Sequence, residues 1–179
     1  MHNDLEKILF TEQEIANRVK EMADVINKDF ENRPITLVVI LKGSAIFAAD
    51  LVRHLTSDIH IEFIRLSSYG NGSVSSQKVD IIGGLNFDVN GKNIIVVEDI
   101  IDTGTTLSKF KEIILSQNPE SLKICSLLNK PARRASVIEA DYKGFDIENE
   151  FVVGYGLDYA QKYRNLPYIG VLKRSVYEK

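Results

Sequence analysis

The sequence lacks the features that would mark a secreted, membrane-spanning or nucleic-acid-binding protein. Its single cysteine, Cys125, allows no internal disulfide and no zinc site built from several cysteines, so we expect a reducing, cytoplasmic setting. No apolar run reaches the ~18–20 residues that a membrane span needs, and the first residues, MHNDLEKILF, do not have the layout of a signal peptide. The net charge of −3 lacks the basic excess that is usual for a nucleic-acid-binding protein.

The composition that remains is that of an ordinary folded domain. Hydrophobic residues make up 44% and charged residues 26% of the 179 positions, which excludes a disordered chain, a collagen-like fibre and a coiled coil. No repeat is visible at a period of about 20–50 residues, and no Pro/Gly-rich linker divides the chain. We therefore expect one domain over residues 1–179.

Apolar patterning predicts strands that alternate with helices. Thr11 and Glu14 form a capping box that begins a helix extending to Lys28. Continuous apolar runs, typical of strands buried on both faces, lie at 35–41, 93–100 and 122–129. Further strands are expected at 59–66, 79–85, 151–156 and 167–172, and further helices at 45–55 and 107–116. This alternation predicts an α/β protein with a mostly parallel central sheet flanked by helices.

The segment VVEDIIDTGTTL carries the densest chemistry in the chain. Glu98, Asp99 and Asp102 end a buried strand, and a Thr/Gly run then opens a helix. Hydroxyls and unpaired N–H groups at a helix start can hold a phosphate, and Gly104 permits the close backbone approach that this needs. Acids beside a phosphate repel it unless Mg²⁺ or sugar hydroxyls lie between them. The pattern therefore predicts a ribose-phosphate site with Mg²⁺, although DTG alone would favour simple helix capping.

The same segment resembles the phosphoribosyl-pyrophosphate (PRPP) motif of the type I phosphoribosyltransferase family. Four more segments resemble the hypoxanthine-guanine phosphoribosyltransferases of that family: LKGS at 41–44, SSYG at 67–70, NKPARR at 129–134 and FVVGYGLDYAQKYRNLPYIGVL at 151–172. The resemblance spans nearly the whole chain from the first of the buried strands onward. It implies a parallel sheet with a small hood and a flexible lid loop, here 67–77. It also implies a purine salvage enzyme that transfers 5-phosphoribosyl from PRPP to N9 of hypoxanthine or guanine and releases pyrophosphate.

The resemblance assigns a role to individual residues. The 5′-phosphate would be held by Asp102, Thr103, Gly104, Thr105 and Thr106, and Asp102 would also accept the purine proton as general base. Pyrophosphate would be held by Lys42, Gly43 and Arg164, and Mg²⁺ by Glu98, Asp99 and Asp158. The purine would contact Lys130, Phe151, Val152 and Asp158, and the lid would close through Ser68 and Tyr69.

The role that the resemblance assigns to Lys130 bears on which purine base is bound. An ammonium donates to a 6-oxo group but clashes with a 6-amino donor, so a lysine there favours hypoxanthine or guanine over adenine. Taken alone, Lys130 would read as an exposed loop lysine followed by solvated Arg133 and Arg134, Phe151 as ordinary core, and Asp158 and Arg164 as a surface pair. One departure from the family pattern is Thr105, where some members carry lysine.

Two alternatives remain open at this point. One is a phosphoribosyltransferase for another base, such as xanthine or a pyrimidine. The other is a non-catalytic PRPP-sensing regulator, which would tend to show a basic face. The family also implies a homodimer or homotetramer, with PRPP and a 6-oxopurine as partners and neither nucleic acid nor membrane. The preference between hypoxanthine and guanine is not readable from the sequence.

Overall fold

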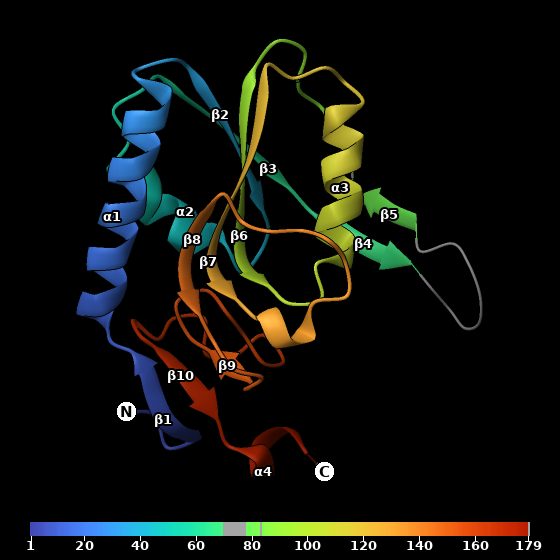
Figure 1. The fold of residues 1–179 in the computed structure, drawn as a ribbon. Helices are drawn as coiled ribbons and strands as arrows, with labels where there is room; N and C mark the ends of the chain where they lie inside the picture. The colour runs from blue at the N-terminus through green and yellow to red at the C-terminus, as the bar shows by residue number, and fades with distance from the viewer. Residues whose placement is uncertain (70–77, 83, 179) are drawn as a thin grey trace.

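The chain, described here from a computed structural model over residues 1–69, 78–82 and 84–178, is built around a parallel sheet (Figure 1). Its five strands lie in the order β3-β2-β6-β7-β8, and every neighbouring pair is parallel. Their bounds are β2 (Ile35–Ile40), β3 (Ile59–Ile64), β6 (Asn93–Ile101), β7 (Ser121–Asn129) and β8 (Tyr142–Asp146). The predicted α/β class is confirmed, with β8 as a strand that apolar patterning did not predict.

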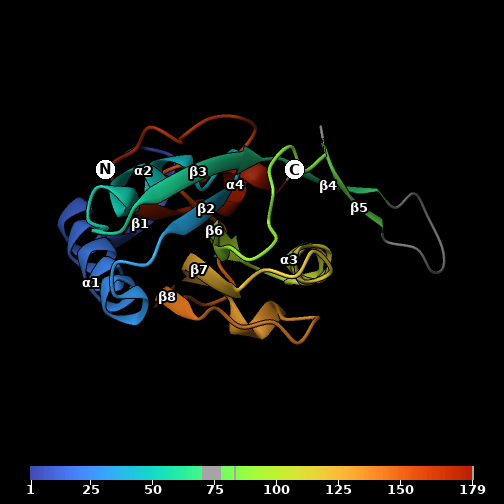
Figure 2. The same ribbon diagram turned by 90° about the horizontal axis from the view of Figure 1, so that it is seen from above.

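Helices cover both faces of this sheet, as the continuous apolar runs predicted. Leu37 and Val39 of β2 pack in one core with α1 (Glu12–Phe30) and α2 (Ala45–Val52). Val38 and Ile40 of the same strand pack on the other face with α3 (Thr105–Leu115). Seen from above, α1 and α3 lie on opposite sides of the sheet (Figure 2). Every residue of β2 is therefore buried, which explains why its sequence does not alternate.

The predicted capping box starts α1. The Glu14 N–H donates to Thr11 Oγ1 at 3.3 Å, and the Thr11 N–H donates to Glu14 Oε2 at 2.8 Å. The helix runs two residues past the predicted end and stops where Glu31 takes a left-handed conformation. In the described parts of the chain, no helix combines the length and the apolar character needed to cross a bilayer.

A second, antiparallel sheet lies at the end of the central sheet where β6 and β7 finish (Figure 1). Its order is β1-β10-β9, with bounds β1 (Leu5–Phe10), β9 (Val152–Val153) and β10 (Ile169–Leu172). The expectation that 151–156 and 167–172 extend the parallel alternation is wrong. Gly154 and Gly156 have positive φ values of 102° and 99°, so the extended run ends after two residues and turns back. This small sheet is the hood that the resemblance implied.

The lid segment begins as a strand rather than as a loop. Strands β4 (Leu66–Tyr69) and β5 (Lys78–Ile81) pair as an antiparallel ribbon that extends away from the main body (Figure 1). The expectation of one loop over 67–77 is therefore wrong for its first three residues. Gly70 and Gly72, on which the lid prediction depends, lie outside the described residues. Two short helices complete the fold, η1 (Pro131–Arg133) and α4 (Arg174–Tyr177).

Candidate active site

Two partly buried carboxyl groups stand side by side near the end of β6. Glu98 and Asp99 interact through their side chains, and Asp99 Oδ1 also accepts a hydrogen bond from the Ile100 N–H at 2.8 Å. Burial raises the pKa of Glu98 well above its ordinary value, and the neighbouring Asp99 charge adds to this. Burial also raises the pKa of Asp99, against the opposing effect of its hydrogen bonds and of Arg164. Desolvation therefore favours the protonated form of both carboxyl groups, and only Asp99 has a nearby cation, Arg164, that opposes it.

The Thr/Gly loop after β6 forms an open cradle. Gly104 has a φ of +76° and precedes α3, whose first N–H groups have no partners within the helix. A Cβ at Gly104 would lie 2.4 Å from Ile138 Cγ2, so the backbone approaches its neighbours too closely for any other residue. The loop borders a pocket of about 240 Å³. Its polar lining consists of Glu98, Asp102, Thr103, Gly104 and Thr106.

The turn after β2 rests on the acid pair. Lys42 and Gly43 follow this strand, and the peptide bond between Leu41 and Lys42 is cis. A Cβ at Gly43 would lie 1.5 Å from Asp99 Oδ2, which means that the Asp99 carboxylate lies directly against the Gly43 backbone. Because β2 and β6 are neighbours in the sheet, their polar ends meet at one edge, as the chain patterning predicted.

A loop from the hood closes over this turn. A Cβ at Gly156 would lie 2.1 Å from the Gly43 carbonyl oxygen, so the two backbones are in contact. Arg164 Nη1 donates to the Gly156 carbonyl at 2.6 Å, and Arg164 Nη2 forms an ion pair with Asp158 Oδ1 at 2.7 Å. The positive charge of Arg164 also acts on Asp99. The structure thus brings Gly43, Asp99, Asp158 and Arg164 into one cluster.

Gln161 belongs to the same cluster and was missed in the sequence. Its side-chain oxygen accepts a hydrogen bond from Lys42 Nζ at 3.2 Å, and its N–H donates to Asp158 Oδ2 at 2.8 Å. It takes a left-handed backbone with a φ of +66°, a conformation uncommon for a glutamine. No local pattern signals this role, because its partner Lys42 lies at the far end of the chain.

Lys130 and Asp102 face each other across the ends of β7 and β6. Lys130 is 7% exposed, and its N–H donates to the Ile101 carbonyl at 2.9 Å, so the interpretation as an exposed loop lysine does not hold. Burial lowers the pKa of Lys130, while the nearby Asp102 carboxylate opposes that effect. Arg133 Nε lies 3.2 Å from Asp102 Oδ1, yet within the described residues this buried oxygen accepts no hydrogen bond.

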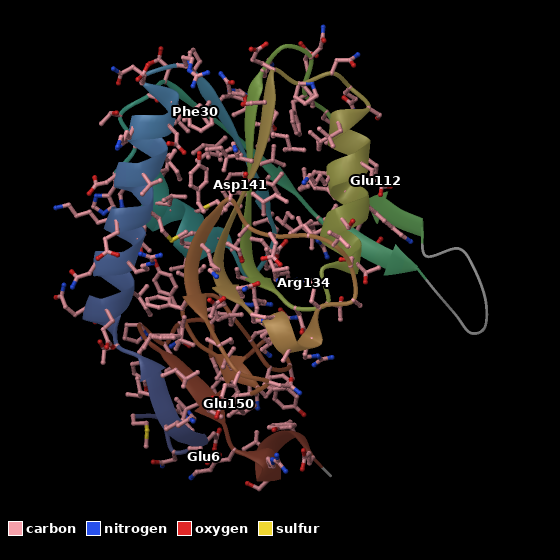
Figure 3. The ribbon with its side chains drawn as sticks, in the orientation of Figure 1. Glu6, Phe30, Glu112, Arg134, Asp141 and Glu150 are labelled. Atoms are coloured by element: carbon pink, nitrogen blue, oxygen red, sulfur yellow. The ribbon has the colours of Figure 1, made fainter. Side chains whose placement is uncertain are left out.

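Arg134 is a second residue that the sequence did not reveal. Its Nη1 donates to the Asp102 carbonyl at 2.9 Å and its Nη2 donates to Asn129 Oδ1, beside η1 (Figure 3). Asn129 Nδ2 in turn donates to Asp146 Oδ1 at 2.6 Å. Two adjacent arginines in NKPARR give no sign of which one turns inward, and the alternative interpretation of both as solvated does not hold for Arg134.

We expect Arg134→Ala to lower the free energy of unfolding by about 1–3 kcal/mol, because it leaves the Asn129 oxygen and the Asp102 carbonyl without their donor. Urea denaturation followed by circular dichroism measures this difference. Arg133→Ala is the matched control, since the Arg133 side chain is 47% exposed and its loss should change stability by less than about 1 kcal/mol. Equal losses in the two variants would contradict a structural role specific to Arg134.

Phe151 and Val152 lie at the start of the hood strand β9, in the small sheet at the end of the central sheet where β6 and β7 finish (Figure 1). Phe151 is 37% exposed, and Val152 is buried in β9, paired with Val171 of β10. Glu150, the residue before Phe151, acts electrostatically on Lys130 and forms an ion pair with Lys7 at 2.6 Å. Phe151 is therefore adjacent in the sequence to Glu150, whose carboxylate interacts electrostatically with Lys130.

The predicted metal ligands are only partly together. Glu98 and Asp99 are adjacent, but Asp158 is engaged by Arg164 and Gln161 instead. Among residues 1–69, 78–82 and 84–178, no three acidic, histidine or cysteine side chains gather as a ready-made metal site. Ser68 and Tyr69 lie in β4, the first strand of the β4–β5 ribbon, and the residues 70–77 that follow lie outside the described ranges.

A family model for the phosphoribosyl transferase domain matches residues 7–160. The chain belongs to this family. The chain is also 47% identical to the hypoxanthine-guanine phosphoribosyltransferase of Staphylococcus epidermidis over 179 residues, covering all of both chains. The crystal structure of a hypoxanthine phosphoribosyltransferase from Staphylococcus aureus superposes with a TM-score of 0.95 at 47% identity, over 100% of this chain and 97% of that one.

A longer relative places the phosphoribosyltransferase sequence in a larger protein. The chain is 46% identical over 179 residues to the bifunctional protein TilS/HprT of Listeria innocua. It spans 28% of the length of that protein. The similarity therefore covers the whole of this chain but only about a quarter of that relative.

Proposed function

We propose that the protein is a purine salvage enzyme that transfers the 5-phosphoribosyl group of PRPP to N9 of hypoxanthine or guanine. The products are IMP or GMP and pyrophosphate. The observation that carries this proposal is the shared edge where Glu98, Asp102 and the Thr/Gly loop line one pocket beside Lys130. Relatives that are named for this reaction and match over the full chain support it.

The loop after β6 would bind the sugar phosphate. Free N–H groups at the start of α3, with the hydroxyls of Thr103, Thr105 and Thr106, suit three phosphate oxygens. The Glu98 and Asp99 carboxylates would accept hydrogen bonds from the ribose hydroxyls. Asp102, at the start of the loop, would lie between the sugar and the base, within reach of both.

The Gly43 cluster would bind the leaving pyrophosphate. The N–H groups of Lys42 and Gly43 and the guanidinium of Arg164 are donors for phosphate oxygens, and a guanidinium binds such oxygens with two parallel hydrogen bonds. As the bond between sugar and pyrophosphate breaks, positive charge develops on the sugar and negative charge on the leaving group. Backbone donors that are already in place would stabilise the departing anion without reorganising, whereas Arg164 would first exchange its contacts with Gly156 and Asp158.

The base would lie between Lys130 and Phe151. Lys130 would donate to the 6-oxo group, the Phe151 ring would stack on the purine, and the Val152 backbone and Asp158 would meet its far edge. The Asp102 carboxylate would accept the purine proton; its Oδ1 accepts no hydrogen bond among the described residues, although it lies 3.2 Å from Arg133 Nε. Ser68 and Tyr69 would close over pyrophosphate from the β4–β5 ribbon, which would exclude water from the reactive sugar.

Mg²⁺ fits the acid pair. This ion takes one or two carboxylates and completes its shell with waters and phosphate oxygens. Glu98 and Asp99 are two adjacent, partly buried carboxyl groups whose pKa values are raised, first by desolvation, so a cation beside them would favour their charged form. Asp158 would serve a second ion only if it exchanged its contact with Arg164. When bound, Mg²⁺ would supply positive charge that neutralises pyrophosphate.

Assembly and setting are further parts of the proposal. A homodimer or homotetramer is supported by Ile61 and Phe63, which are 38% and 58% exposed on the edge strand β3. Light scattering after size exclusion measures the oligomeric state.

The setting and domain organisation are also part of the proposal. The buried, unpaired Cys125 is consistent with a cytoplasmic protein, and a single domain over 1–179 accommodates both sheets. The substrates PRPP and a 6-oxopurine would be its partners, rather than nucleic acid or a membrane.

A base panel tests the proposed reaction. The protein is mixed with PRPP, Mg²⁺ and one base at a time, and nucleotide formation is followed by ultraviolet absorbance. We expect consumption of hypoxanthine, guanine or both, and release of pyrophosphate. Consumption of a pyrimidine or adenine, with neither 6-oxopurine used, would overturn the proposal.

We expect Lys130→Met to raise KM for hypoxanthine by about 10-fold or more, because the 6-oxo group loses a charged donor in a desolvated site. Methionine keeps the length of the side chain and removes its charge. Steady-state kinetics at saturating PRPP measure the change. The control is Lys20→Met on the exposed face of α1, which should behave as the wild type. An unchanged KM in Lys130→Met would remove the assignment of Lys130 to the base.

A further inference from the structure

The short helix α4 is fastened to the hood directly after β10. The Lys173 N–H donates to the Asp4 carbonyl at 2.9 Å, and Lys173 Nζ donates to the Asn3 carbonyl at 2.6 Å. The Glu178 N–H donates to the Arg174 carbonyl at 2.8 Å, which closes the turn. The residues of α4 are therefore held at a defined place on the small sheet.

This anchoring puts an aromatic ring against Phe151. The rings of Phe151 and Tyr177 stack with centroids 4.9 Å apart and an interplanar angle of 25°. Tyr159 meets the Phe151 ring edge-on at 5.6 Å and 89°, and it also contacts Tyr177 at 6.5 Å. Offset stacks and edge contacts of this kind favour a fixed ring plane. Phe151 is thus oriented by two tyrosines, while 37% of its surface stays exposed.

Tyr177 and the proposed base partners come from different parts of the fold. In Figure 1, α4 lies beyond β9 and β10, on the side of the hood away from the central sheet. Lys130 and Asp102 come from the ends of β7 and β6, on the opposite side. The stack with Tyr177 covers one face of the Phe151 ring, and 37% of Phe151 stays exposed. The proposed reaction requires the base to stack on the other face of this ring.

We propose that Tyr177 is a positioning residue of the purine site, which holds the Phe151 ring in the plane that a bound hypoxanthine or guanine needs. This inference rests on the proposed function. A base gains full stacking only on a ring that is already fixed, because a mobile ring must lose rotational freedom on binding. Tyr177 touches neither base nor sugar, so its effect should fall on base affinity and leave the chemical step unchanged.

Three variants separate this role from ordinary packing. Tyr177→Leu keeps an apolar side chain but removes the ring, and Tyr177→Phe keeps the ring but removes the hydroxyl. Val176→Ala removes packing from the same helix and the same apolar cluster without touching the stack, and it is the matched control. Steady-state kinetics with hypoxanthine and with PRPP give KM for each substrate and kcat.

We expect Tyr177→Leu to raise KM for hypoxanthine by about 3- to 10-fold, with kcat and KM for PRPP within about twofold of the wild type. Tyr177→Phe and Val176→Ala should keep the wild-type KM for hypoxanthine. Equal KM values for Tyr177→Leu and Val176→Ala would overturn the inference, as would a lower KM in Tyr177→Leu, which would mean that Tyr177 occupies the face of the base. A wild type that turns over no 6-oxopurine would instead overturn the proposed function.

Discussion

Asp102→Asn is expected to lower kcat for hypoxanthine by about 10²- to 10⁴-fold, the range that a positioned acid or base contributes. The Asp102 carboxylate lies where the loop begins, and its buried Oδ1 accepts no hydrogen bond among the described residues. Its ion pair with Arg133 Nε, at 3.2 Å, involves a half-exposed side chain, which the bound base would displace when Asp102 takes the proton. Asparagine has nearly the same shape, but its amide does not take up that proton. The measurement is kcat at saturating PRPP and hypoxanthine.

The effect of Asp102→Asn should be confined to the chemical step. Because the Asp102 backbone carbonyl, which holds Arg134, is unchanged, the fold and KM for PRPP should stay close to the wild type. Asp24→Asn, on the exposed side of α1, is the control for loss of one carboxylate charge. An Asp102→Asn enzyme with the kcat of the wild type would remove Asp102 from its role as base.

Gly43→Ala is expected to reduce kcat/KM for PRPP by about 100-fold, because displacing a bound group by about 1 Å already has an effect of that size. The added Cβ would lie 1.5 Å from Asp99 Oδ2 and 2.5 Å from its Cγ. Either the acid pair or the turn must move, and the turn is also in contact with Gly156. One methyl group therefore disturbs the proposed sites of pyrophosphate and of Mg²⁺ together.

Gly91→Ala separates this local effect from general loss of stability. Gly91 lies in the turn before β6 with a φ of +66°, and a Cβ there meets nothing within 4 Å. Alanine should be strained at that position and lower the free energy of unfolding by about 1 kcal/mol, with kcat/KM for PRPP unchanged. If Gly43→Ala and Gly91→Ala lose activity equally, the steric account of the Gly43 turn is wrong.

Local patterns predicted the parts of the fold that depend on local physics. The buried runs of β2, β6 and β7, and the capping box of α1, need only burial on two faces and a hydroxyl before a helix. The Thr/Gly loop after β6 could also be predicted as a candidate phosphate site, because acids, glycine and threonines follow a buried strand without interruption. The assignments to base and pyrophosphate came from resemblance to a family, and the structure adds contacts that support them.

Other features depend on contacts between distant segments. The hood strand β9 has two residues, too few to show a period, and β1 (LEKILF) neither alternates nor forms a continuous apolar run; both form by pairing with β10. The contact between Gly43 and Gly156 and the hydrogen bond between Lys42 and Gln161 join segments more than 110 residues apart in the sequence. Arg134 points inward because Asn129 and the Asp102 carbonyl offer acceptors there, and neither acceptor is identifiable before the strands are placed side by side.

The central claim is that one cleft, between the ends of β2, β6 and β7 and the hood, encloses a phosphorylated sugar and its divalent ion. A crystal structure of the protein with IMP, pyrophosphate and Mg²⁺ tests it most directly. We predict the 5′-phosphate within hydrogen-bond distance of the 103–106 N–H groups, the 6-oxo group at Lys130, and Mg²⁺ near Glu98 and Asp99. A nucleotide bound elsewhere, or bound with its phosphate away from that loop, would contradict the account.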